Sequence, residues 1–102
     1  MNSSNQSKIS SMLQFAYVAR KLSFGESVIV KMMNSQIKVM VLANDVAPSQ
    51  KKKYLDKAEY YNVKVVTYLS KSELGALFSK DQVACVGVSD INMANQIIKL
   101  AQ

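Results

Sequence analysis

Three short apolar runs, separated by segments with helical periodicity, constrain the fold of this chain more than any other feature. They span residues 37–43, 63–69 and 83–88 and are rich in valine. Apolar runs of this length, bounded by polar and turn residues, are typical of strands that are buried on both faces. Because they alternate with helical segments, they predict a three-layer α/β/α sandwich around a mostly parallel sheet.

The helices that separate these runs carry recognisable start signals. Apolar periodicity predicts helices over residues 9–22, 26–35, 48–61 and 91–102. Ser70 and Glu73 form the signature of a capping box, which predicts a further short helix. Pro48 suits the first turn of its helix, and Asp90 can cap the last one. The residues LSFG at 22–25 add a brief extended piece, so we expect a central mixed four-stranded sheet.

Length and composition indicate one domain without obvious catalytic chemistry. The chain has 102 residues, one cysteine and no histidine. It therefore has no means of forming an intrachain disulfide, a Cys/His zinc cluster or a histidine-based catalytic site. We expect no enzyme activity, no cofactor and no metal. Residues 1–8 are polar and predict a flexible N-terminal lead to a single domain over 9–102.

Hydropathy predicts a cytoplasmic protein. No apolar run approaches the roughly 20 residues of a membrane span, and the polar N-terminus is unlike a signal peptide. The expected state is a monomer that has no membrane partner and no small-molecule substrate.

Positive charge is concentrated in the first half of the chain. Residues 1–53 contain eight basic and two acidic residues, whereas residues 54–102 contain five of each. The whole net charge of +6 thus belongs to residues 1–53. Such an imbalance favours a polyanionic partner, nucleic acid first. The alternative is a solvated surface that keeps the protein soluble.

A polar corner and three lysines follow the first long apolar run. Asn44 and Asp45 end the run, and the lysines at 51–53 lie early in the next helix. Ligands of open α/β sheets bind outside the carboxyl ends of strands. Lysines at a helix N-terminus are disfavoured by the helix dipole, so a ligand would explain them. A solvated helix face is the alternative reading.

A second polar corner begins at Gly25. A helix that starts there exposes unpaired N–H groups suited to phosphate or base edges, and Ser27 and Lys31 share one of its faces. The opposite arc holds Val28, Ile29 and two methionines, which predicts the core-facing side. An ordinary polar helix face is the alternative. Neither corner contains a nucleotide-binding glycine motif, which disfavours a nucleotide cofactor.

Several ordered motifs together resemble a known family. They are ARKLSFGE from Ala19, VMVLANDVAP from Val39, KKKYLDKAEYYNV from Lys51 and SKSELG from Ser70. In this order and spacing they resemble the ribosomal-protein superfamily of the L7Ae/L30e type, which binds RNA kink-turns, and most closely its small bacterial YlxQ-type members. The resemblance implies an α/β/α sandwich that recognises a sharply bent element of structured RNA.

The resemblance also implies which residues contact RNA. The family's Asn-Glu pair, which reads base edges, falls on Ser27 and Val28, so this chain departs from the usual pattern. The family's lysine is retained as Lys31, and the loop over the extruded nucleotide falls near residues 82–84. The full expected RNA-binding set is Gly25, Glu26, Ser27, Val28, Lys31, Asn44, Asp45, Lys51, Lys52, Gln82, Val83 and Ala84.

The expected function is that of a non-enzymatic RNA-binding protein. Its partner would be a kink-turn-like structured RNA, from ribosomal RNA or an mRNA leader, in association with ribosomes or translation. Two alternatives remain open. One is a basic protein-interaction adaptor, and the other is an RNA-associated protein that has lost kink-turn discrimination.

Overall fold

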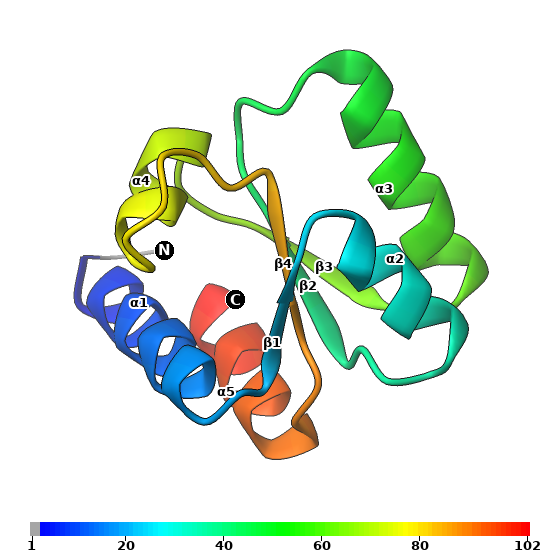
Figure 1. Ribbon diagram of the computed structural model, residues 1–102. Coiled ribbons are helices and arrows are strands. Elements are labelled where there is room, and N and C mark those ends of the chain that lie inside the picture. Colours follow the sequence, from blue (N-terminus) through cyan, green and yellow to red (C-terminus); the bar gives the residue numbers. More distant parts are fainter. Residues whose placement is uncertain (1–2) are drawn as a thin grey trace.

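Helices and strands alternate along the whole described chain. The computed structural model describes residues 3–102 (Figure 1). Its elements are α1 (Ser3–Val18), β1 (Leu22–Phe24), α2 (Glu26–Met33), β2 (Val39–Leu42), α3 (Pro48–Tyr60), β3 (Lys64–Thr67), α4 (Lys71–Ala76), β4 (Cys85–Val88) and α5 (Ile91–Ala101). None of the described helices combines the length and apolar character needed to cross a membrane.

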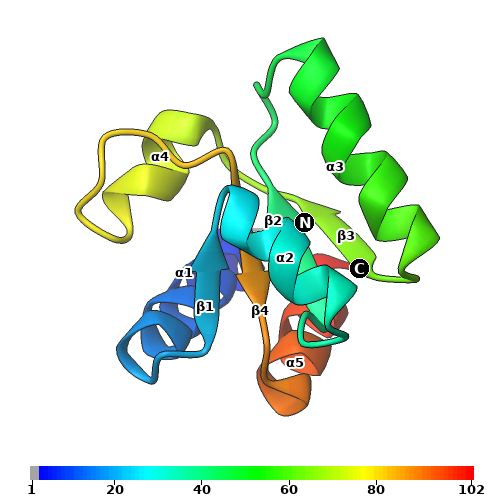
Figure 2. The same cartoon turned by 45° about the vertical axis from the view of Figure 1, so that its right-hand side comes forward.

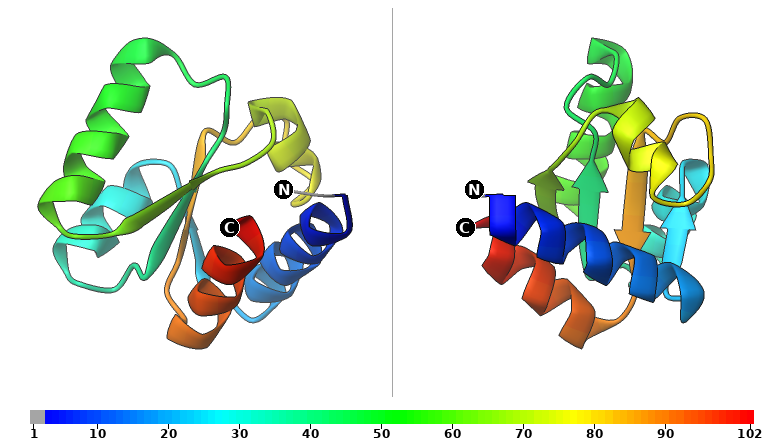
Figure 3. Two further views of the ribbon diagram at one scale, coloured as in Figure 1. Left: turned by 180° about the vertical axis from the view of Figure 1, so that it is seen from behind. Right: turned by 90° about the vertical axis from the view of Figure 1, so that its left-hand side faces the viewer.

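The elements form the expected three layers. Helices α1 and α5 pack side by side on one face of the sheet, and α2 and α3 cover the other face (Figures 2 and 3). The short helix α4 lies beyond one end of the strands. The three-layer sandwich is confirmed.

The sheet is mixed, with strand order β1-β4-β2-β3. Strands β2 and β3 pair in parallel, whereas β4 runs antiparallel to both β1 and β2. The central mixed four-stranded sheet is confirmed, but the expectation that it would be mostly parallel was wrong. The reason is the connection from β3 to β4. It contains only the six-residue α4 and a loop, and it stays at one end of the sheet, so β4 starts where β2 ends.

The first helix differs most from expectation, because it begins at Ser3 and ends at Val18 rather than spanning 9–22. Residues 3–8, which we expected in a flexible lead, belong to α1, and residues 1–2 lie outside the described part. Asn5 Nδ2 donates to the Leu100 carbonyl at 3.2 Å, and the Tyr68 hydroxyl donates to the Gln6 carbonyl at 2.5 Å. These contacts hold the start of α1 to α5 and to the end of β3.

Core packing is densest around the two central strands, since every residue of β2 and β4 is buried. The edge strand β3 is partly exposed, contrary to the expectation of a fully buried run. In α2, Val28, Ile29 and Met32 are buried as the helical arc predicted. Met33, which was predicted to join them, is 56% exposed because it lies at the last position of the helix.

Apart from that of α1, the predicted helix starts agree with the structure. Ser70 Oγ accepts from the Glu73 N–H at 3.1 Å, and Glu73 Oε1 accepts from the Ser70 N–H at 3.0 Å, which completes the capping box. Asp90 Oδ1 accepts from the Met93 N–H at 3.0 Å, and Pro48 opens α3. Side-chain chemistry therefore determines where these helices begin.

Candidate nucleic-acid interface

One end of the sheet gathers most of the predicted site. Strands β1, β2 and β3 finish at this end and β4 starts there, and we call it the Gly25 end. Gly25 has φ 58° and ψ −132°, a backbone conformation that L side chains rarely adopt. Its N–H donates to the Cys85 carbonyl at 3.4 Å, and its carbonyl accepts from the Val28 N–H at 3.0 Å. Gly25 thus joins the end of β1 to the start of both β4 and α2.

The first turn of α2 presents polar groups to solvent. Among the described residues no side chain caps this helix, so the first-turn N–H groups need partners from outside it. The side chains of Glu26 and Ser27 are exposed. Val28 is fully buried, and its Cγ1 lies against Gly87 of β4. The side chain of Val28 is therefore inaccessible to a ligand, because α2 turns that position toward the sheet, and a contact of this residue with RNA stays a prediction for its backbone alone.

The corner after β2 lies next to the Gly25 turn. The Ala43 N–H donates to the Ala84 carbonyl at 2.9 Å, and the Asn44 N–H donates to the Leu69 carbonyl at 2.8 Å. Asp45 Oδ1 accepts from the Lys71 N–H at 2.8 Å, so this carboxylate holds the start of α4. Asn44 and Asp45 are exposed. The side chain of Asn44 is thus the free polar group of the corner, while that of Asp45 has a structural partner.

The loop before β4 completes the Gly25 end. Gln82 is exposed and Ala84 is half-buried, but Val83 is buried and its N–H donates to the Lys71 carbonyl at 3.0 Å. Val83 therefore anchors the loop with its side chain buried, and its contact with RNA stays a prediction for its backbone alone. A Cβ at Gly75 would meet the Lys80 carbonyl at 2.7 Å, which shows how closely α4 packs against this loop.

Sequence reasoning missed an aromatic group beside the same loop. The rings of Phe24, Tyr17 and Phe78 contact one another, with centroids 5.2 to 5.7 Å apart. Lys80 Nζ lies 4.9 Å from the centre of the Phe24 ring. The only signal in the sequence was the position of Phe24 directly before Gly25. This group places a cation and an aromatic edge next to the candidate interface.

Two of the three consecutive lysines have carboxylate partners. Lys53 Nζ forms an ion pair with Glu26 of α2, and Lys52 Nζ lies 2.9 Å from Asp56 Oδ2. Lys51 is exposed. These pairs offset the dipole penalty of lysines near a helix start, so a ligand is not required to explain them. The Gly25 end is accordingly less positive than the sequence suggested.

Lys31 lies away from the other predicted contacts. It belongs to the last turn of α2 and lines a shallow cleft with Ser35, Gln36, Lys38 and Ser89. This cleft is at the opposite end of the sheet, where β2 begins and β4 ends. The structure thus groups Gly25, Asn44 and residues 82–84, and it sets Lys31 along the side of α2.

A buried thiol lies under the Gly25 turn. Cys85 Sγ donates a long hydrogen bond to the Gly25 carbonyl at 3.9 Å. Burial raises the pKa of the Cys85 thiol to about 11, and burial likewise raises the pKa of the neighbouring Tyr54. Both groups are protonated at neutral pH, so neither supplies a nucleophile to this end.

Comparison with known proteins identifies the family. A model described as "Ribosomal protein L7Ae/L30e/S12e/Gadd45 family" matches residues 7–98. The chain belongs to this family. The resemblance drawn from the four sequence motifs is confirmed.

Two relatives of known name are about one third identical to this chain in sequence. "RNA-binding protein YlxQ" of Bacillus subtilis (strain 168) is 33% identical over 90 residues, which cover 87% of the chain and 90% of the relative. "RNA-binding protein YlxQ" of Enterococcus faecium is 30% identical over 103 aligned positions, with 100% and 99% covered.

Solved structures agree with the fold. A protein of unknown function from Bacillus halodurans C matches with a TM-score of 0.88 and 30% identity, over 92% of this chain and 96% of that one. The 15.5kD RNA binding protein of Giardia lamblia matches with a TM-score of 0.78 over 99% and 88%. Its identity is 13%, so this second match supports the fold alone.

Proposed function

We propose that this protein is a non-enzymatic RNA-binding protein that recognises a kink-turn-like element through its Gly25 end. One observation carries the proposal. Three separate segments, the start of α2 at residues 25–27, the corner at 44–45 and the loop at 82–84, meet at one end of the sheet. The curated relatives named as RNA-binding proteins support RNA as the partner class.

The proposed contacts divide into recognition and affinity. The unpaired N–H groups of α2, the Ser27 hydroxyl and the Asn44 amide supply hydrogen bonds to base edges and to sugar. The exposed Lys51 supplies charge to the phosphate backbone, and Lys31 does so where the RNA follows α2. Because these groups come from a fixed surface, the RNA is selected mainly by its shape, as is usual for structured RNA.

A second candidate is an RNA-associated protein without kink-turn discrimination. Two observations favour it. Val28 is buried at a position where the family reads a base edge, and Lys52 and Lys53 are paired with carboxylates. Under this alternative, contacts with the phosphate backbone of the RNA supply all of the affinity, and the G·A pairs of a kink-turn contribute nothing to binding.

A calorimetric titration separates the two candidates. One RNA carries a kink-turn with its tandem G·A pairs, and the other carries Watson–Crick pairs in their place. Kink-turn recognition predicts at least tenfold tighter binding to the first RNA, whereas equal affinity establishes the second candidate. Introducing glutamate at Val28 is unsuitable as a rescue, because a carboxylate would be buried there. Ser27→Asn is the better gain-of-recognition variant, since its amide would be exposed.

Matched variants locate the surface. Ser27→Ala and Lys51→Ala should each weaken binding several-fold. Asn95→Ala and Lys57→Ala should leave it unchanged, since Asn95 lies on α5 across the sheet and Lys57 lies near the far end of α3. All four side chains are exposed, so the free energy of unfolding should change by no more than about 0.5 kcal/mol. Equal losses in all four variants would contradict a localised site.

In the cell, the protein is proposed to act as a monomer in the cytoplasm, in association with the translation machinery. Sequencing of RNA crosslinked to the protein in cells tests it directly. Enrichment of ribosomal RNA or mRNA leaders is expected. A uniform distribution over the transcriptome would contradict it.

A further inference from the structure

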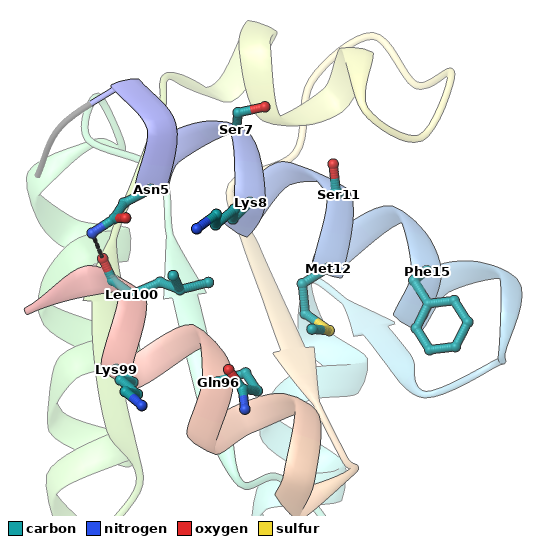
Figure 4. A pocket seen from close by; sticks show the side chains of 9 residues that line it. All are labelled: Asn5, Ser7, Lys8, Ser11, Met12, Phe15, Gln96, Lys99 and Leu100. Carbon is teal, nitrogen blue, oxygen red and sulfur yellow. Dashed lines mark hydrogen bonds between the residues drawn. The ribbon is translucent and has the colours of Figure 1, made fainter.

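The face of the molecule opposite α2 and α3 carries a groove between α1 and α5. It has a volume of about 710 Å³ (Figure 4). Its walls are two helices that run antiparallel, because Asn5 at the start of α1 bonds to Leu100 near the end of α5. None of the groove's lining residues belongs to the Gly25 end.

The groove has an apolar floor of Met12, Phe15 and Leu100, and its lining also includes the polar residues Asn5, Ser7, Ser11 and Gln96. Lys8, Met12 and Phe15 follow one another at helical spacing along α1, and Leu100 lines the α5 side. Phe15 is 61% exposed, so most of a large aromatic ring faces solvent. A smaller adjoining cleft, which shares Met12 and Phe15, extends the groove to Met93. Exposed phenylalanine next to adaptable methionines is typical of surfaces that bind other proteins.

Charge is distributed unevenly along the groove. Lys8 and Lys99 lie toward the end where Asn5 meets Leu100, and Phe15 lies toward the other (Figure 4). The described residues that line the groove include no acidic side chain. The nearest carboxylate in the adjoining cleft is Asp90, which already accepts from the Met93 N–H. The groove therefore offers two cations at one end, beside Leu100, and the apolar side chains of Met12 and Phe15 beyond them.

We propose that this groove binds an amphipathic helix of a partner protein that carries carboxylates at one end of its apolar stripe. The carboxylates pair with Lys8 and Lys99, and two or three large apolar side chains cover Met12, Phe15 and Leu100. Lys8 and Phe15 are seven residues apart, about 10 Å along the axis of α1. A partner helix of about two to three turns matches that length.

Charge complementarity favours a partner helix over two other occupants of the groove, an RNA strand and a second copy of this chain. An RNA strand carries charge at every nucleotide, whereas the two cations of the groove, Lys8 and Lys99, lie at one end, and the polar groups of Ser7, Ser11 and Gln96 along it carry no charge. A second copy of this chain has a net charge of +6 and the same two lysines, so self-docking would bring like charges together. The sheet separates the groove from α2 and α3, which lets a protein and an RNA bind at the same time.

Selection from a helix library provides an unbiased test. The full chain is immobilised, and a phage-displayed library of 16-residue helical peptides of random surface composition is selected against it. The proposal predicts enrichment of peptides with apolar residues at i, i+3 or i+4 and i+7, and with Asp or Glu concentrated in one terminal turn. Enrichment of basic peptides, or of none, overturns it.

Titration of the enriched peptide against variants locates the binding. Phe15→Ala and the double variant Lys8→Glu, Lys99→Glu should each weaken binding at least tenfold by fluorescence anisotropy. Val18→Ala, on the same helix and 79% exposed, and Lys57→Glu, on the far side of the sheet, are the matched controls. Circular dichroism checks that every variant folds. Equal effects of Phe15→Ala and Val18→Ala overturn the assignment.

Two further measurements test whether a second copy of this chain or an RNA occupies the groove instead. Sedimentation should show a monomer at all concentrations, and a dimer that Phe15→Ala dissolves would make the occupant a second copy. RNA affinity should fall no more per reversed charge in the Lys8→Glu, Lys99→Glu variant than in Lys57→Glu, because the double variant reverses two charges and the control reverses one. A much larger loss would make the groove part of the RNA surface and overturn the proposal.

Discussion

Gly25 is the residue on which the geometry of the candidate interface depends most directly. Its φ of 58° lets the chain turn from β1 into α2 within one residue. The same turn brings the Gly25 N–H to the Cys85 carbonyl and leaves the first N–H groups of α2 facing outward. A residue with a Cβ would need a different turn and would move the start of α2.

Replacing Gly25 by alanine should therefore destabilise the protein through backbone strain alone. A Cβ there would meet no described atom within 4 Å, so a steric clash is not involved. The expected loss is about 1–3 kcal/mol in the free energy of unfolding, measured by urea denaturation. Ser27→Ala is the control, with a change within about 0.5 kcal/mol. Similar losses for the two variants would show that the turn relaxes freely.

The buried thiol of Cys85 should make the stability of the protein depend on pH. Its pKa in the folded protein is about 11, and an unfolded thiol titrates near 9.0. The folded state thus holds this proton more tightly than the unfolded state does, so this contribution to stability is complete below pH 9 and is lost as pH rises toward 11.

Urea unfolding at pH 8, 9 and 10 measures this effect. The free energy of unfolding should decline over this range in the wild type and decline less in Cys85→Ala. The same burial should keep a thiol reagent from labelling the native protein at pH 8, while the urea-unfolded protein is labelled readily. Fast native labelling, or identical pH slopes in the two proteins, would contradict the assignment.

At the scale of the elements, an ion pair fastens α2 to α3. Lys53 and Glu26 form it, and their side chains are 46% and 68% exposed, so its effect on stability is small. The pair should matter more for RNA binding than for stability. It neutralises the charge of Lys53 and places the Glu26 carboxylate at the proposed RNA surface. Glu26 was expected to contact RNA, and this pairing offers a different role for it.

Glu26→Gln distinguishes the two roles of that carboxylate. If it only neutralises Lys53, the substitution frees one ammonium group and removes one negative charge, so RNA should bind about 2- to 5-fold tighter. Glu59→Gln, an exposed acid of α3, is the control for net charge. Weaker RNA binding by Glu26→Gln, with Glu59→Gln unaffected, would mean that Glu26 itself reads the RNA.

The elements also show what local sequence can predict. The starts of α4 and α5 were predictable because Ser70 and Asp90 make hydrogen bonds to residues three positions away. The direction of β4 was not, since an apolar run has the same pattern in either direction and its neighbours are far away in sequence. Val28 is instructive because periodicity placed it in the core and the family pattern placed it at the interface. Its burial agrees with the periodicity.

Two further features of the site could not be predicted, for one shared reason. Lys31 is only six residues from Gly25 in sequence, but the rise of α2 carries it toward the other end of the sheet. The pairing of Lys53 with Glu26 joins residues 27 positions apart. The sequence of a single segment does not show at which end of the sheet a side chain will lie, nor which residue of another helix it will pair with.

For the whole molecule, ion pairing moderates how steeply RNA binding should depend on salt. With Lys52 and Lys53 paired, about three phosphate contacts are expected, fewer than the count of lysines suggests. Raising salt from about 50 to 200 mM should then weaken binding about 20- to 40-fold. Fluorescence anisotropy over this range measures the slope. A slope that corresponds to six or more contacts would mean that RNA breaks both ion pairs.

The strand order has a consequence for how the chain is made. Strand β1, from the N-terminal quarter, and strand β2 are both held by β4, which is the last strand along the chain. A nascent polypeptide that has not yet reached Cys85 contains the β2–β3 pair but lacks the strand that joins it to β1. The complete sheet, and with it the packing of the Gly25 turn against Cys85, can therefore assemble only after β4 has been synthesised. The three segments of the Gly25 end come together at that step, although the β2–β3 pair can form before it.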